Sequence, residues 1–234
     1  MAEIPLVVID VQRPGPVTGL PTRTEQSDLK FVISASQGEF PRMVIALRNP
    51  SDAFYQTMGP HRLNAASRPA WFFKHDQYGG ILCDIGSHQI EQFLYYTGAN
   101  DATVVSCRAV NQAHPEYPEL EDFGDCTLIA DNGASGYFRV DWFTPDGLPT
   151  WGDGRTFILG TEGFIELRKY VDLCTDRMGG RVYLANGKET ICFDVTGKVG
   201  YPFFGQLILD CLNRTENAME AEHLVVISSL KWFY

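Results

Sequence analysis

The sequence lacks the features of several large classes of protein. It has no basic leader followed by a long apolar run, and no apolar segment long enough to cross a membrane. Basic residues are scarce. The chain has 19 Lys and Arg and 29 Asp and Glu, which gives a formal net charge of -10. An acidic surface repels phosphate, which argues against nucleic acids and anionic membranes as partners. We therefore expect a soluble, cytoplasmic protein whose partner is a small molecule.

Cysteine pairs with the spacing of redox or zinc motifs are also missing. The six cysteines are scattered, with no C-x-x-C among them. A chain of 234 residues, 44% of them hydrophobic, can bury a core without disulfide bonds. We expect reduced thiols, several of them buried.

Regular elements are scarce at the start of the chain. The short apolar run "LVVID" leads into "VQRPGPVTGLPTRTEQSD", whose prolines and glycines interrupt any regular element. We predict an irregular segment over residues 1–39 and a folded domain over residues 40–234.

What the sequence does contain is a series of short strands. Each is rich in β-branched and aromatic residues and is bounded by turn residues. Because strands that follow one another without crossover helices pair antiparallel, we predict a largely antiparallel sheet. In "GYFRVDWF", Phe138, Val140 and Trp142 share one face. The predicted strands are "RMVIAL", "AFYQTMGPHRL", "TVVSCRAV", "GDCTLIAD", "GYFRVDWF", "RTFILG", "GFIELRK", "RVYLAN" and "ETICFDV".

Three helices complete the prediction. One spans most of "GGILCDIGSHQIEQFLYYTGA" (residues 79–99), one begins at Pro202 and ends near "NRTEN", and one begins after Asn217 with Glu220 placed as in a capping box. The predicted fold class is therefore α+β, an open-faced sheet with helices packed on one face. The aromatic side chains on the other face need cover, so we expect a homodimer or higher oligomer through that face.

The first helix carries an acid and a histidine four positions apart. At about 100° per residue, Asp84, His88, Glu91 and Tyr95 fall in one sector, opposite the apolar residues. Side chains at i and i+4 can meet, so Asp84 could fix the tautomer of His88, and a histidine can act as a general base near neutral pH. A solvated polar face fits the same spacing. A metal site of Asp84, His88 and Glu91, in an isomerase or hydrolase, is a further alternative, although the usual pair of helical histidines is absent.

The 79–99 stretch resembles the G-G-x-L-x-D-x-G-x-H motif of the Gfo/Idh/MocA family of NAD(P)-dependent oxidoreductases, which act mostly on sugars, cyclitols and related polyols. Four further segments resemble the second domain of such enzymes in the same order, over about residues 38–219. They are "GPHRL", the R-P-x-W loop, "RTFILGTEGFIELRKY" and "GYPFFGQLILDCLNRTENAM".

The resemblance implies a role for each residue of the pair. His88 would take the proton of a substrate hydroxyl as hydride leaves the adjacent carbon, and Asp84 would orient or charge-balance it. The lysine of the family's E-K-P tripeptide has no counterpart, because no Lys-Pro occurs in the sequence. Nor is there a strand leading into G-x-G-x-x-G, and "GDGRTF" at 152–157 reads into a strand. We expect the substrate-binding and oligomerisation half of an NAD- or NADP-dependent enzyme, without its nucleotide-binding domain.

Polar and aromatic residues around the motif are candidate contacts for a sugar or polyol. The tryptophans could equally anchor loops over the sheet. A non-catalytic sugar-binding or assembly module remains the alternative function. The candidate substrate-binding residues are His61, Arg62, Arg68, Trp71, Tyr78, Trp151 and Arg155.

Overall fold

A computed structural model describes residues 7–11, 29–35, 43–47, 54–161, 163–174, 179–196, 202–219 and 221–230. The first three ranges are strands β1 (Val7–Val11), β2 (Leu29–Ala35) and β3 (Met43–Leu47), which form a small antiparallel sheet in that order. Two of these strands lie within 1–39, and the rest of that predicted irregular segment is outside the described residues.

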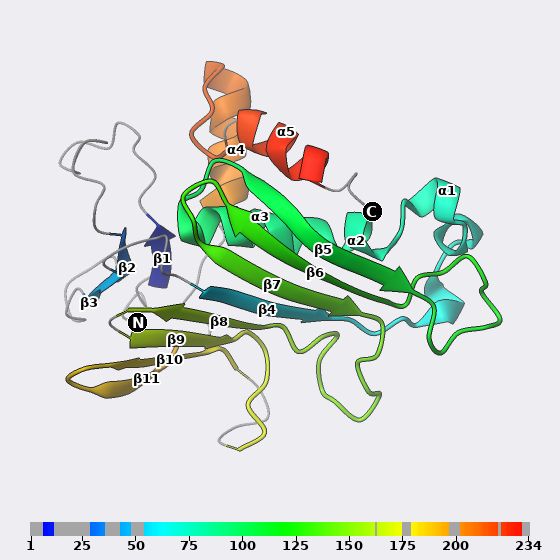
Figure 1. Ribbon diagram of the computed structural model, residues 1–234, viewed down its shortest axis with the longest axis horizontal. Coiled ribbons are helices and arrows are strands. Elements are labelled where there is room, and N and C mark those ends of the chain that lie inside the picture. The colour runs from blue at the N-terminus through cyan, green and yellow to red at the C-terminus, as the bar shows by residue number, and fades with distance from the viewer. Residues whose placement is uncertain are drawn as a thin grey trace.

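The main sheet has eight strands in the order β11-β10-β9-β8-β4-β7-β6-β5 (Figure 1). Neighbouring strands pair antiparallel except β4 and β7, which pair parallel. The predicted strands and the α+β class are thus confirmed. The strands are β4 (Phe54–Pro60), β5 (Ala102–Val110), β6 (Phe123–Ala130), β7 (Ser135–Asp141), β8 (Arg155–Gly160), β9 (Gly163–Arg168), β10 (Arg181–Asn186) and β11 (Thr190–Asp194).

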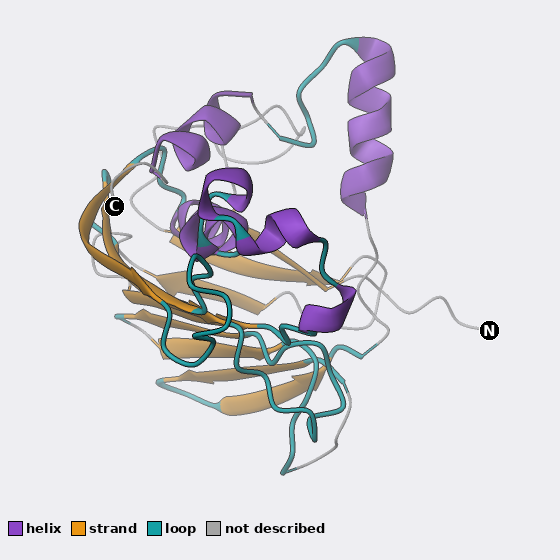
Figure 2. Cartoon of the chain, turned by 90° about the vertical axis from the view of Figure 1, so that its right-hand side faces the viewer, coloured by secondary structure: helices purple, strands orange, loops and turns teal. Residues whose placement is uncertain are grey.

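Helices cover one face of this sheet (Figure 2). Short helices η3 (Ala65–Ser67), η4 (Ala70–Phe73) and α1 (His75–Tyr78) follow β4, and α2 (Ile81–Asp84) and α3 (Gly86–Thr97) lie across the strands. Phe138 and Val140 of β7 point toward the helices and are 2% and 0% exposed. Gly136 lies under Phe93 of α3, where a Cβ atom would come within 2.6 Å of the ring. This contact brings α3 close to the sheet.

The opposite face of the sheet is open, as predicted. It carries the alternate residues of each strand, which include exposed apolar side chains and ion pairs such as Arg108 with Asp125 at 3.0 Å. The exposed apolar residues on this face are Phe54, Val105, Ile129, Leu159 and Phe164.

Two C-terminal helices, α4 (Pro202–Asn213) and α5 (Ala221–Leu230), follow the sheet. The first matches its prediction. The second is described from Ala221, and Glu220, predicted as its capping-box residue, lies outside the described residues. Before it, the Asp210 carboxylate accepts hydrogen bonds from the Asn217 side chain and the Ala218 N–H. The side chain of Glu216 then accepts the N–H of Ala221 at 3.1 Å and caps the helix.

None of the helices in the described part of the chain is both long and apolar enough to span a membrane. The six cysteines are all free thiols. Cys126 alone is buried, whereas Cys174, Cys192 and Cys211 are exposed, so the prediction that several are buried is wrong.

Candidate active site

The helix that was predicted to carry Asp84 and His88 is broken between them. Asp84 is the last residue of α2, Ile85 follows as a turn, and α3 begins at Gly86. Ile85 is 4% exposed because its side chain enters the core, and a Cβ atom on Gly86 would lie 3.3 Å from Phe138. Ile85 keeps right-handed helical backbone angles, and its carbonyl oxygen accepts the N–H of His88 at 3.1 Å, so a tighter i→i−3 turn separates the two helices.

The two side chains face solvent, on the side away from the core. Both Asp84 and His88 are exposed, whereas Ile90, Phe93 and Leu94 are almost fully buried. The prediction that His88 lies off the apolar face is confirmed. No hydrogen bond joins Asp84 to His88 in the described structure, although the charge of the imidazole acts on the carboxyl. Neither side chain is therefore occupied by the other, and both can bind a ligand.

Three positively chargeable side chains surround Asp84. Crowding by protein atoms raises the pKa of its carboxyl, even though the side chain reaches solvent, and Arg68, His61 and His88 oppose that rise. Two of them, Arg68 and His61, come from the segment that follows β4. Strand β4 thus brings two of the predicted substrate contacts beside the predicted pair.

His61 is held in one tautomer. Its Nδ1 lies 3.1 Å from the carbonyl oxygen of Gly59, which can only accept, so Nδ1 carries the proton and Nε2 keeps its lone pair. Burial lowers the pKa of His61, while the Gly59 carbonyl and Asp84 act in the opposite direction. The ring packs edge-on against Trp142 and Trp151, at 5.7 and 6.3 Å between centroids. His61 is therefore a neutral, positioned imidazole near neutral pH.

Arg68 lies among three aromatic rings. Its guanidinium carbon is 4.5 Å from the ring centre of Phe72, 4.8 Å from Trp142 and 5.2 Å from Trp151. Its Nε donates to the carbonyl oxygen of Leu63 at 3.2 Å. The stacked guanidinium still has donors for a ligand oxygen. Trp142, which sequence reasoning did not select, contacts both Arg68 and His61. The available signal was that Trp142, directly after β7, continues the alternation of buried residues that begins with Phe138 and Val140.

The other predicted contacts serve mainly to hold the loops. Arg62 donates to the carbonyl oxygens of Pro145 and Leu148, each at 2.8 Å. Arg155 donates through Nε and Nη2 to Asp153, at 2.9 and 2.6 Å. These arginines are committed to contacts within the chain.

Tyr78 lies close enough to Asp84 for that carboxylate to act on its hydroxyl, and its ring packs on Phe72 at 5.3 Å between centroids. The hydroxyl of Tyr78 accepts the N–H of Glu121 at 2.9 Å, and burial raises its pKa. Trp71 is 52% exposed beside Phe72.

A three-ligand metal site is not found in the described part of the chain, where no cluster of three His, Cys, Asp or Glu side chains could hold an ion. Glu91, the third ligand of the alternative hypothesis, faces His223 of α5 at 3.9 Å.

Comparison with known proteins identifies the domain that carries these residues. The model of a protein family described as the GFO/IDH/MocA C-terminal domain matches residues 52–166, which include Asp84, His88, His61 and Arg68. The chain carries a Gfo/Idh/MocA C-terminal domain. An oxidoreductase from Erwinia carotovora atroseptica is 56% identical, with a TM-score of 0.73, over 76% of this chain and 53% of that one.

More distant structures share the fold of this Gfo/Idh/MocA domain. An oxidoreductase from Thermotoga maritima is 22% identical with a TM-score of 0.60, over 76% of this chain and 50% of that one. One from Agrobacterium radiobacter, solved with NAD+, L-tartaric acid and magnesium, is 16% identical with a TM-score of 0.55, over 76% and 52%. The chain spans about half the length of these oxidoreductases.

A second, short similarity is to a different class of enzyme. The 2-oxoglutarate oxidoreductase subunit KorA of Mycobacterium tuberculosis is 57% identical over 54 residues, which are 23% of this chain and 8% of that protein. An alpha subunit of a 2-oxoacid:ferredoxin oxidoreductase from Aeropyrum pernix is 46% identical over 61 residues, 26% of this chain and 10% of that protein. Matches of this length carry no activity over to the chain.

The described residues do not form a dinucleotide cradle. In these ranges no strand leads into a glycine-rich turn at the start of a helix, which is the arrangement that binds a pyrophosphate. The glycines at 152 and 154 precede strand β8, as predicted.

Proposed function

We propose that this chain is the substrate-binding half of an oxidoreductase that transfers hydride between a hydroxyl-bearing carbon of a sugar or polyol and NAD or NADP. His88 takes up the hydroxyl proton, and Asp84 balances the charge that His88 gains. The observation that carries this proposal is the placement of Asp84 among His61, Arg68 and His88, within residues that match a Gfo/Idh/MocA domain.

The chemistry follows from what each side chain can donate or accept. An exposed imidazole at His88 can reach a bound hydroxyl, and a histidine can accept its proton near neutral pH. Arg68 offers guanidinium donors to the oxygen that becomes a carbonyl, and the rings beneath it fix its plane. His61, with its Nε2 lone pair, accepts a neighbouring hydroxyl. Together these groups orient a polyol with one oxygen at His88.

NAD or NADP, when bound, would accept the hydride. The described residues do not fit its pyrophosphate, so we derive no step through it and place its binding residues outside this substrate-binding half. The Agrobacterium structure, which shares the fold, was solved with NAD+, and this chain covers 52% of that one.

The assembly proposed for this half is a homodimer through the open sheet face, in the cytoplasm. Five apolar side chains, each between 38% and 56% exposed, lie on that face beside ion pairs. A second copy would shield them from water without leaving charges unpaired.

The test compares the chain alone with the chain joined to the part of the Erwinia oxidoreductase that lies outside the match. NADH or NADPH formation is followed at 340 nm with a panel of polyols and sugars. We expect turnover by the joined protein, and a His88→Ala variant that binds the same polyol but turns it over at least a hundredfold more slowly. Polyol binding without turnover in every joined form would instead favour the non-catalytic binding module.

A further inference from the structure

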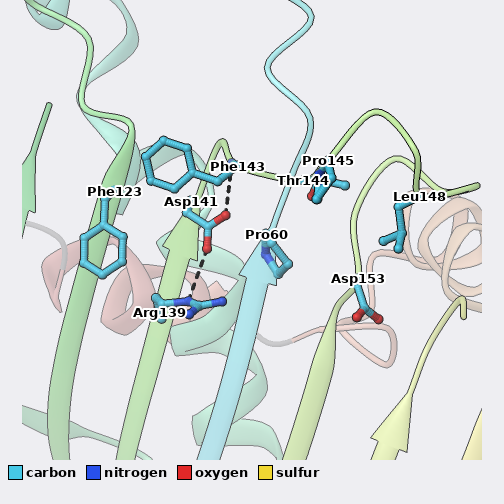
Figure 3. A pocket seen from close by; sticks show the side chains of 9 residues that line it. All are labelled: Pro60, Phe123, Arg139, Asp141, Phe143, Thr144, Pro145, Leu148 and Asp153. Atoms are coloured by element: carbon cyan, nitrogen blue, oxygen red, sulfur yellow. Dashed lines mark hydrogen bonds and ion pairs between the residues drawn. The ribbon is translucent and has the colours of Figure 1, made fainter. Parts of the chain in front are cut away.

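A cavity lies on the open face of the sheet, away from helix α3. It has a volume of about 310 Å³ and is formed where β4 and β7 end and β6 begins (Figure 3). Arg139 and Asp141 line it, whereas Val140 between them points to the helix side. The cavity therefore lies on the other face of the sheet from His88, although it reaches the strand ends, where the charges of His61 and Asp141 act on each other. Its lining residues are Pro60, Phe123, Arg139, Asp141, Phe143, Thr144, Pro145, Leu148 and Asp153.

Two buried polar atoms in this lining have neither a hydrogen bond nor an ion pair. Nε of Arg139 also lacks a hydrogen bond, but it forms an ion pair with Asp141 at 3.2 Å. Thr144 is 7% exposed, and its Oγ1 neither donates nor accepts a hydrogen bond. The Oδ1 atom of Asp153 is also buried and unpaired, although Oδ2 of the same carboxylate binds Arg155. Leaving such groups unpaired is costly, and native proteins seldom do so. A molecule in the cavity would satisfy both atoms.

The remaining walls define what that molecule must be. Asp141 holds Arg139 at 3.2 Å, so the positive charge of the guanidinium is already balanced. Asp153 is likewise balanced by Arg155 at 2.6 Å. A charged ligand would therefore leave a net charge in the cavity, and a neutral one would not. Oδ1 of Asp153 needs a donor, the hydroxyl of Thr144 takes either role, and the guanidinium needs an acceptor. Hydroxyl groups satisfy all three.

The apolar part of the lining suits the carbon skeleton of such a molecule. Phe123 and Phe143 form one side, and Pro145 and Leu148 form the other (Figure 3). The second side is fixed, because Arg62 binds the carbonyl oxygens of Pro145 and Leu148. A site with apolar walls and a few placed polar groups is the usual form of a small-molecule site.

We propose that this cavity is a second binding site, separate from the Asp84 and His88 pair, for a neutral polyhydroxylated molecule of about one ring. This cavity adjoins the candidate active site at one point. Pro60 lines the cavity, and the next residue, His61, belongs to the candidate active site and accepts the N–H of Thr144 on its carbonyl oxygen at 3.1 Å.

The experiment is calorimetric titration of the whole chain with myo-inositol, with cyclohexanol as a ring of similar size that bears one hydroxyl. Variants Thr144→Val and Asp153→Asn test the two unpaired atoms, and Thr103→Val, an exposed threonine of β5, is the matched control. We expect saturable binding of inositol that Thr144→Val weakens at least tenfold and Thr103→Val leaves unchanged. Since Thr144→Val removes an unpaired hydroxyl, its thermal midpoint should equal or exceed that of the wild type.

Four results would overturn the inference. They are absence of inositol binding, equal binding of cyclohexanol, a lowered midpoint in Thr144→Val, and inositol affinity that falls as chain concentration rises. The last result would assign the cavity to a side chain of a second copy. Loss of binding in His88→Ala but not in Thr144→Val would place the polyol at the proposed active site instead, and would leave the proposed function standing.

Discussion

The buried hydroxyl of Thr57 should stabilise the packing of helix α3 on the sheet through its hydrogen bond to Gln89. Thr57 is 1% exposed, and its Oγ1 lies 2.9 Å from Oε1 of Gln89 and 3.2 Å from Oγ1 of Thr156. Gln89 follows His88 in α3, and Thr57 lies in the strand that leads to His61. The substitution Thr57→Val keeps the side-chain volume and removes only the hydroxyl.

The expected cost follows from the polar groups left behind. Valine cannot donate to the buried amide of Gln89, and an unsatisfied buried acceptor costs about 1–3 kcal/mol. We expect the free energy of unfolding to fall by about 2 kcal/mol, and the thermal midpoint by about 4–8 °C for a chain of this length. Urea unfolding followed by circular dichroism measures the first, and a thermal scan measures the second.

The control for this variant is again Thr103→Val, which changes the same groups on an exposed position of β5 and should alter stability by less than about 0.5 kcal/mol. Equal stability of Thr57→Val and the wild type would refute the view that this hydroxyl joins the helix to the sheet.

Further predictions concern acidity, packing and assembly. Burial raises the pKa of Asp84 in the folded state, so the free energy of unfolding falls as pH rises above about 4. In urea titrations, Asp84→Asn should therefore be more stable than the wild type at pH 7 and equally stable at pH 3. Because the pKa of His61 is lowered on folding, stability falls as pH drops through about 6.5, and His61→Gln should flatten that part of the profile. Gly136→Ala forces a Cβ atom against the ring of Phe93 and should destabilise the fold by about 1–3 kcal/mol, an effect that a well-folded, unchanged variant would disprove. Leu159→Asp on the open face should convert dimers to monomers in analytical ultracentrifugation, whereas a wild-type chain that is already monomeric at micromolar concentration would contradict the proposed dimer.

Local patterns allowed most of the elements to be predicted from the sequence. The alternation of Phe138 and Val140 with polar neighbours identifies β7 and its buried face, and Pro202 marks the start of α4. Both signals depend on residues close together in the chain.

The arrangement of the sheet and the site depends on distant contacts, which the sequence pattern does not contain. Strand β4 lies between β7 and β8, so its partners are about 80 and 100 residues away. The break at Ile85 is a tighter turn closed by the His88 N–H on the Ile85 carbonyl oxygen, and helical periodicity alone predicts a continuous helix through it. The stacking of Arg68 on Trp142 joins two loops. Asp84 and His88 could be selected from the sequence as candidate site residues. Their neighbour Trp142 could not be selected in the same way.

Proton transfer by His88 can be measured by chemical rescue. His88 is exposed, so the space left by His88→Gly is open to added imidazole. In the joined protein, we expect this variant to oxidise its polyol at least a hundredfold more slowly than the wild type. Added imidazole should restore a saturable part of the rate with the substrate KM unchanged. A His88→Gly variant with the wild-type rate, or one that imidazole does not rescue although it binds the polyol normally, would contradict the claim.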